Sequence, residues 1–221
     1  MPRALIFDFD GVVADSEVLA NTVLAEVVTE LGVPTTLEDS YRLYLGKRFS
    51  EIITAIETSV GRTLPDSFPA EFQAKTLDRF RQSLAPIPGV REFITRFGHA
   101  PRCIASSSSP DRLALCLDVL DMTSLFEGRV FSASNVARGK PYPDIFLHAS
   151  DNIGVAPGEC IVIEDSASGV VAARAAGCTV IGLLAAGHLP RDHGLSLKDA
   201  GAQHLALDYR EAERIVADLL H

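Results

Sequence analysis

The sequence has 221 residues, and 47% of them are apolar, which is enough to fill the core of a globular protein of enzyme size. Its formal net charge of −9 argues against a general nucleic-acid binder, because such proteins carry basic surfaces that neutralise phosphates. Membrane and secretory segments are not expected either, since no run of about 18 apolar residues occurs and acidic residues interrupt the start of the chain. We therefore expect a cytoplasmic protein, monomeric or weakly dimeric, whose four dispersed cysteines are reduced core residues.

Short apolar runs alternate with helix-like stretches along most of the chain. Such runs are typical of strands that are buried on both faces of a parallel sheet. They occupy residues 4–7, 103–105, 130–131, 160–163, 179–183 and 204–207. The alternation predicts an α/β fold with a Rossmann-like parallel sheet.

Residues 16 to about 83 interrupt this alternation. Three stretches there, 18–31, 50–60 and 69–84, have helical patterns, and no convincing strand lies between them. Pro86, Pro88 and Gly89 punctuate the chain where the alternation resumes. We expect a core formed by residues 1–15 and 84–221, with residues 16–83 inserted as a helical domain.

Two pairs of acidic residues follow apolar runs. Asp8 and Asp10 end the first run, and Glu164 and Asp165 end the run at 160–163. Open α/β sheets bind ligands at the carboxyl ends of their strands. Asp8 and Asp165 offer the hard oxygen ligands that Mg²⁺ prefers. Considered alone, the pair at Asp8 can also be a polar strand end, and the pair at Asp165 can be the N-cap of a helix.

Two further segments are candidates for phosphate binding. The serine cluster that includes Ser106 and Ser107 follows a predicted strand and opens a helix, so its amides and hydroxyls can bind an anion, or the cluster can be a turn with an N-cap. Lys140 lies in the segment Gly-Lys-Pro-Tyr-Pro-Asp, where the prolines stiffen the backbone around it. A lysine held in this way is a candidate counter-charge for phosphate, whereas most lone lysines are solvated.

Together these four segments, in this order, resemble the haloacid dehalogenase superfamily over nearly the whole chain. Its four motifs correspond to Asp8-x-Asp10-Gly11-Val12, Ser106, Lys140 and Glu164-Asp165. The helical insertion is similar to the cap domain of the subgroup that contains phosphoglycolate phosphatase, β-phosphoglucomutase and sugar phosphatases, including those that act on 6-phosphogluconate. The resemblance implies a phosphatase that acts on a small phosphorylated metabolite, such as a sugar phosphate or sugar acid phosphate.

The resemblance also implies a mechanism and a cofactor. Asp8 would attack phosphorus to form an aspartyl-phosphate, and Asp10 would protonate the leaving alcohol and then activate water. Mg²⁺ would be held by Asp8, the Asp10 carbonyl and Asp165, with Glu164 contributing directly or through water. Ser106, neighbouring amides such as that of Ser107, and Lys140 would bind the phosphoryl group.

Two alternatives remain open from the sequence. One is a β-phosphoglucomutase, although such mutases carry a cap histidine where this chain has Ala20. The other is a binding domain without catalytic activity, which the intact motifs disfavour.

Within the insertion, Lys47 and Arg48 can contact a second anionic group of the substrate, or they can form a solvated basic pair. His188 and His193 are assigned no role.

Overall fold

The computed structural model describes residues 4–45, 47, 49–126, 128–190 and 192–220. The chain divides into two compact units, one formed by Met1–Asp15 with Ala85–His221 and the other by Ser16–Leu84. In the first unit, Asp15 donates its backbone N–H to the carbonyl of Ala85, and Ala14 forms a β-bridge with Pro86. The chain therefore leaves and re-enters this unit at adjacent positions.

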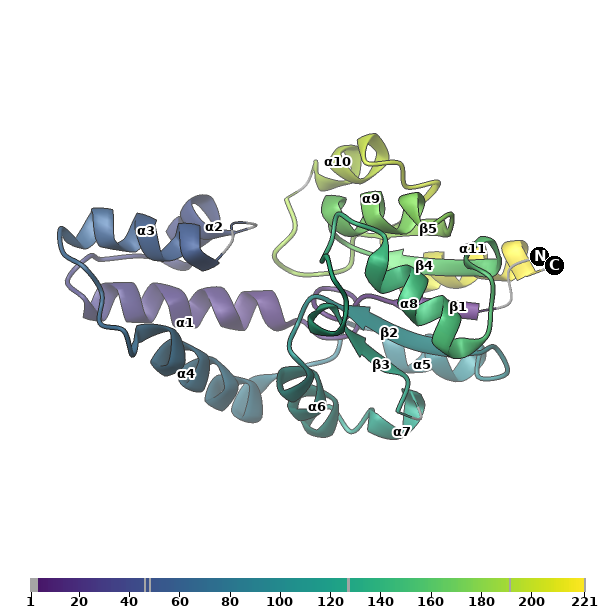
Figure 1. Ribbon diagram of the computed structural model, residues 1–221, viewed down its shortest axis with the longest axis horizontal. Coiled ribbons are helices and arrows are strands. Elements are labelled where there is room, and N and C mark those ends of the chain that lie inside the picture. The colour runs from purple at the N-terminus through teal and green to yellow at the C-terminus, as the bar shows by residue number, and fades with distance from the viewer. Residues whose placement is uncertain (1–3, 46, 48, 127, 191, 221) are drawn as a thin grey trace. The chain divides into compact units, whose positions relative to one another are not determined.

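The first unit is built on a six-stranded sheet in which every paired strand is parallel (Figure 1). In chain order the strands are β1 (Ala4–Phe7), β2 (Arg102–Ser106), β3 (Val130–Ser132), β4 (Cys160–Glu164), β5 (Thr179–Leu183) and β6 (His204–Ala206). Their order in the sheet is β3-β2-β1-β4-β5-β6. The predicted parallel α/β fold is confirmed: five of the six apolar runs lie within these strands, and the run at 204–207 extends one residue beyond β6.

The register of the three central strands determines which residues meet at the edge of the sheet. Phe7 of β1 lies opposite Ile104 of β2 and Ile163 of β4. The next residues along these strands, which include Asp8 and Glu164, therefore lie side by side at their carboxyl ends.

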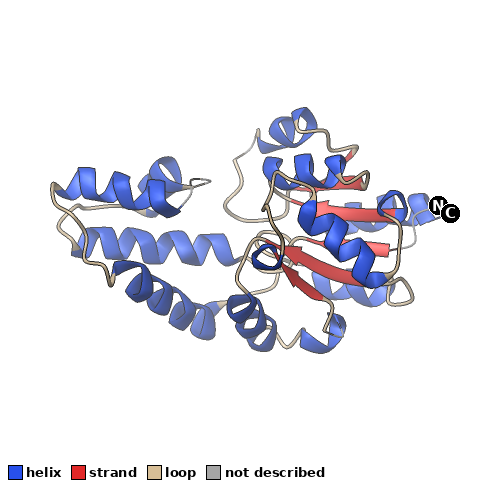
Figure 2. Cartoon of the chain, in the orientation of Figure 1, coloured by secondary structure: helices blue, strands red, loops and turns tan. Residues whose placement is uncertain are grey.

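Helices cover both faces of this sheet (Figure 2). They are α5 (Val90–Arg96), α6 (Pro110–Val119), α7 (Thr123–Phe126), α8 (Asp144–Ile153), α9 (Ala167–Ala175), α10 (His193–Asp199) and α11 (Tyr209–Leu220), with 3-10 turns η1 (Ala133–Asn135) and η2 (Pro157–Glu159). Side chains alternate along β1, so that Ile6 joins the core formed with α8, α9 and α10. On the other face the Phe7 ring makes edge contacts with the rings of Phe93 and Phe126.

The four cysteines are buried and form no disulfide, as the sequence predicted. They are Cys103, Cys116, Cys160 and Cys178. Burial raises the pKa of the Cys116 thiol to about 11, so this side chain stays neutral and behaves as a small apolar group. Among the residues that the structure describes, no helix is long and apolar enough to cross a membrane.

The described residues of the second unit form four helices with a core of their own. They are α1 (Ser16–Glu30), α2 (Leu37–Tyr44), α3 (Phe49–Val60) and α4 (Phe68–Ser83). Val28, Tyr44 and Ile56 are almost fully buried in this core. The sequence analysis did not predict α2, which begins with a capping box between Thr36 and Asp39. The two hydrogen bonds from Thr36 and an ion pair with Arg42 lower the pKa of Asp39 to about 2.

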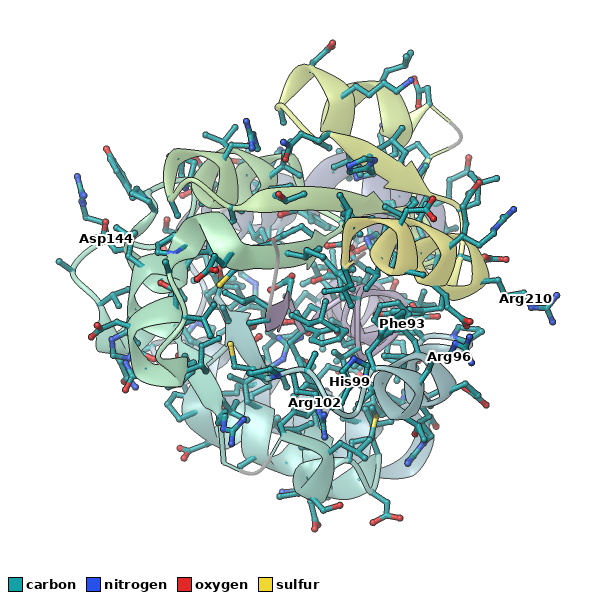
Figure 3. The ribbon with its side chains drawn as sticks, turned by 90° about the vertical axis from the view of Figure 1, so that its right-hand side faces the viewer. Phe93, Arg96, His99, Arg102, Asp144 and Arg210 are labelled. Carbon is teal, nitrogen blue, oxygen red and sulfur yellow. The ribbon has the colours of Figure 1, made fainter. Side chains whose placement is uncertain are left out.

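Tyr209 attaches the C-terminal helix to the loop after β1. Its hydroxyl donates a hydrogen bond of 2.8 Å to the carbonyl of Val12, and its ring contacts that of Phe93 at 5.0 Å between centroids (Phe93 is labelled in Figure 3). We expect Tyr209→Phe to lower the free energy of unfolding by about 1–3 kcal/mol, because the buried Val12 carbonyl loses this donor. Urea denaturation measures this change. Tyr142→Phe, at a half-exposed position, is the control and should have no effect; equal stabilities of the Tyr209 variant and wild type would contradict the role of this bond.

Candidate active site

Lys140 connects two carboxylates at the carboxyl edge of the sheet. Its Nζ atom donates to Asp8 Oδ1 at 2.7 Å and to Glu164 Oε1 at 2.6 Å, and only 5% of its side chain is exposed. Burial alone would lower the pKa of Lys140, but the charges of Asp8 and Glu164 outweigh burial and raise that pKa. Lys140 is therefore a fixed positive charge beside Asp8.

The loop that carries Lys140 is closed by an ion pair. Arg138 donates through Nε and Nη2 to the two carboxylate oxygens of Asp144, at 3.1 and 2.8 Å. The Arg138 guanidinium also lies 4.4 Å from the centre of the Tyr142 ring. Asp144 begins α8, so this ion pair joins the two ends of the segment that contains Lys140 at the start of that helix.

Three buried carboxylates gather around this lysine. Oxygen atoms of Asp8, Glu164 and Asp165 all lie within 4.8 Å of one another. Burial, opposed by Lys140 and reinforced by Glu164 and Asp10, raises the pKa of Asp8 to about 7. The hard oxygen atoms of these three carboxylates fit a divalent cation such as Mg²⁺.

Both carboxylate oxygens of Glu164 have hydrogen-bond partners. Oε1 accepts from Lys140, while Oε2 accepts from the backbone N–H and the hydroxyl of Ser166 at 2.8 and 2.9 Å. The side chain has no exposed surface. Glu164 therefore orients Lys140 in this structure, and any contact with a cation would add to that function.

Two glycines leave room for the acidic side chains. A Cβ atom on Gly11 would lie 1.8 Å from Asp165 Oδ2, and a Cβ atom on Gly169 would lie 1.6 Å from Glu164 Oε1. Gly11 also has a φ angle of +76°, which a residue with a side chain rarely adopts. The acidic side chains can therefore occupy these positions only because residues 11 and 169 are glycines.

Asp10 is held by a different set of residues. Its Oδ2 accepts from the hydroxyl of Ser108 at 2.6 Å, and its Oδ1 accepts from Arg112 Nη2 at 2.6 Å. Ser108 lies in the loop before α6, and Arg112 lies in the first turn of that helix. Neither residue was assigned a role of its own from the sequence. Their spacing of four residues, which can place two side chains near one another at the start of a helix, was the only available signal.

The serine cluster occupies the carboxyl end of β2, next to β1. Ser106 is buried, and its hydroxyl accepts from the backbone N–H of Ser108 at 3.1 Å, whereas Ser107 is exposed. The phosphate-binding roles of both residues stay predictions. Lys47 is exposed on the second unit, and Arg48 lies outside the described residues.

His188 and His193 both lie against Asp165, although the sequence analysis assigned them no role. His193 Nε2 is 2.5 Å from the backbone carbonyl oxygen of Asp165, and His188 Nε2 is 3.8 Å from Asp165 Oδ2. Burial lowers the pKa of His188, against the opposing charges of Asp15 and Asp10. No sequence pattern could show this contact, because the histidines follow β5 while Asp165 follows β4.

Comparison with known proteins identifies relatives along most of the chain. A sequence profile described as haloacid dehalogenase-like hydrolase matches residues 5–183. A phosphorylated carbohydrates phosphatase from Thermotoga maritima is 34% identical over 90% of this chain and 92% of its own length. The 6-phosphogluconate phosphatase of Escherichia coli is 27% identical over 80% of each chain.

A solved structure and a longer relative extend this comparison. The crystal structure of a family hydrolase from Deinococcus radiodurans, with bound phosphate and sodium, is 30% identical and has a TM-score of 0.85 over 98% of this chain and 96% of that one. The Arabidopsis thaliana protein SUPPRESSOR OF QUENCHING 1 is 33% identical over 78% of this chain, which spans only 17% of that protein.

Gly169 provides a test of how tightly the site is packed. Alanine normally stabilises a helix by about 1 kcal/mol relative to glycine. We expect Gly169→Ala to do the opposite and lower the free energy of unfolding by about 1–3 kcal/mol, because the new methyl group would displace Glu164 from Lys140. Urea denaturation measures the sign. Gly158→Ala, where a Cβ meets no atom within 4 Å, is the matched control; stabilisation by Gly169→Ala would show that Glu164 is not confined there.

Asp8→Asn tests the cost of ionising Asp8 in its buried position. In the metal-free protein the pKa of Asp8 is raised to about 7, above its ordinary 3.8, so wild-type stability should fall as pH rises from about 4 to about 7. Asparagine does not titrate. We therefore expect Asp8→Asn to be more stable than wild type at pH 7.5 by at least about 1 kcal/mol, with a smaller difference at pH 5. Urea denaturation in a chelating buffer measures the free energies of unfolding of both proteins at the two pH values. If the stability difference between Asp8→Asn and wild type shrinks as pH rises, the raised pKa of Asp8 is contradicted.

Proposed function

The chain belongs to the haloacid dehalogenase-like hydrolase family, and from this premise we propose that it hydrolyses the phosphoric monoester of a small sugar or sugar acid. Asp8 is the proposed nucleophile and Mg²⁺ the proposed cofactor. The observation that carries this proposal is the buried arrangement of Asp8, Lys140 and Glu164, in which one carboxylate is held by a lysine that a second carboxylate orients.

In the proposed first step, a carboxylate oxygen of Asp8 attacks phosphorus and the bond from phosphorus to the sugar oxygen breaks. Lys140 offsets the repulsion between the carboxylate and the phosphoryl group, which amounts to several kcal/mol at the dielectric of a protein interior. Asp8, Asp165 and the Asp10 carbonyl would hold Mg²⁺, which would supply further positive charge beside the transferring phosphoryl group. Ser106 and the neighbouring amides, including that of Ser107, are proposed to bind the phosphoryl oxygens.

Asp10 is the proposed acid and base. It protonates the departing sugar oxygen and then removes a proton from the water that attacks phosphorus, which releases phosphate and regenerates Asp8. Ser108 and Arg112 occupy both carboxylate oxygens of Asp10 in this structure. At least one of these bonds must therefore open, or be shared with substrate, during the proposed proton transfer.

The names of relatives support a phosphorylated carbohydrate as the substrate. One relative at 34% identity is a phosphatase of phosphorylated carbohydrates, and another acts on 6-phosphogluconate. We propose that residues 16–84 form a cap that selects the sugar, with Lys47 and Arg48 available for a second anionic group. Ala20 replaces the cap histidine of similar mutases, which favours hydrolysis over phosphosugar isomerisation.

Phosphate release from a panel of sugar phosphates and sugar acid phosphates, with Mg²⁺, tests this function. Wild type should release phosphate, and Asp8→Asn should lose at least about a thousandfold in kcat/KM because the nucleophile is absent. Asp151→Asn, at an exposed position of α8, is the matched control and should keep wild-type activity. The conversion of glucose 1-phosphate to glucose 6-phosphate is followed in parallel.

The outcomes are distinct. Isomerisation without net phosphate release would make the protein a phosphosugar mutase. Full phosphate release by Asp8→Asn would contradict the proposed nucleophile, and silence of wild type across the panel and in the isomerisation assay would favour a binding domain that has lost catalysis.

A further inference from the structure

Two histidines from the segment after β5 approach Asp165 at two different groups. His193, the first residue of α10, reaches the backbone carbonyl, with 2.5 Å between Nε2 and the oxygen. A carbonyl oxygen can only accept, so Nε2 of His193 must carry the proton of this bond. His188, five residues earlier, approaches the carboxylate, with 3.8 Å between its Nε2 and Asp165 Oδ2.

The carboxylate of Asp165 is also confined from the side of β1. Its Oδ2 atom lies so close to the backbone of Gly11 that a Cβ atom there would overlap it at 1.8 Å. The Asp165 side chain is 7% exposed and that of His188 6% exposed. Asp165 is thus fixed through its main chain by His193 and bordered at its carboxylate by Gly11 and His188.

His188 has an additional feature that packing alone does not require. Its Nδ1 atom is buried and finds no hydrogen-bond partner among the residues that the structure describes. Buried polar atoms without a partner are rare in native proteins, and each calls for an explanation such as strain, a functional role or a bound water or ion. In this protein the unpartnered atom belongs to a ring that borders a carboxylate of the acidic cluster.

We propose that His193 and His188 are positioning residues that hold Asp165 in the orientation required to bind the divalent cation. This inference rests on the proposed function, since that function assigns a metal to Asp165. Outer residues that orient a metal-binding carboxylate typically change metal affinity by ten- to a hundredfold when they are replaced. His188 and His193 then support the metal site without being ligands themselves.

A purely structural role makes a different prediction. If His193 only anchors α10 to the loop after β4, its replacement will lower thermal stability and leave the affinity of the folded protein for Mg²⁺ unchanged. The test therefore measures Mg²⁺ binding to the substrate-free protein by isothermal titration calorimetry, alongside the Tm of the metal-free protein. Phosphate release is assayed separately.

The variants distinguish the effect of the His193 hydrogen bond on Mg²⁺ affinity from the effect of the side chain's shape. His193→Phe keeps a ring and removes the donor, whereas His193→Gln places an amide N–H near the position of Nε2. We expect the Kd for Mg²⁺ to rise about tenfold or more in His193→Phe, and to stay within about threefold of wild type in His193→Gln. His188→Asn should also raise this Kd. If His193→Phe does not fold, His193→Leu takes its place in the same comparison.

His99→Phe is the matched control. His99 is exposed and precedes β2, at the amino end of that strand, whereas the site lies at the carboxyl ends (Figure 3 labels His99). This variant should bind Mg²⁺ as wild type does.

Equal Mg²⁺ affinities in wild type, the folded His193 variants and His188→Asn would overturn the inference, even if wild type releases phosphate. Weaker binding in His193→Phe or His193→Leu, restored in His193→Gln, would support it even if no tested phosphate ester is hydrolysed. Failure of wild type to bind Mg²⁺ at all would overturn both this inference and the proposed cofactor.

Discussion

The contact of Lys140 with Asp8 and Glu164 is the interaction on which the rest of the site depends. Taking a lysine and two carboxylates out of water costs several kcal/mol for each ion, so such a group is stable only when its geometry is good and its remaining atoms have partners. The fold meets that condition with β1 and β4 as neighbours, the Arg138–Asp144 ion pair across the loop of Lys140, and Ser166 on the second oxygen of Glu164. Lys140 has a raised pKa as a result, and it keeps its charge.

The same site disfavours the ionised form of Asp8. Burial raises the pKa of Asp8, Lys140 opposes this shift in part, and the charges of Glu164 and Asp10 add to it. Oxygen atoms of Asp8, Glu164 and Asp165 lie within 4.8 Å of one another, where a divalent cation would be well placed. Such a cation would favour the ionised Asp8 that attacks phosphorus in the proposed mechanism.

The sequence predicted the sheet and the acidic centre because both follow from local patterns. Apolar runs that end in Asp8 and Glu164 indicate buried parallel strands, and parallel strands bring their carboxyl ends to one edge. The partners of Asp10 and Asp165 could not be predicted in this way. Arg112 contacts Asp10 across 102 positions of the chain, and His193 contacts Asp165 across 28, and both contacts depend on the paths of loops after the strands. The close approach of Gly169 to Glu164 is likewise a property of the packed helix, since glycine in a helix looks unfavourable from sequence alone.

Formation of a covalent phosphoenzyme on Asp8 is the central claim of this account. It is tested most directly by mixing Asp10→Asn with Mg²⁺ and acetyl phosphate, whose carboxylate leaving group needs no acid, then quenching in acid, digesting the protein and locating the added phosphoryl group by mass spectrometry. The account predicts a phosphoryl group on the peptide that contains Asp8, accumulated because the variant lacks the base that activates water. The account would be contradicted if wild type releases phosphate while Asp10→Asn carries no phosphoryl group at Asp8, or carries one on another residue.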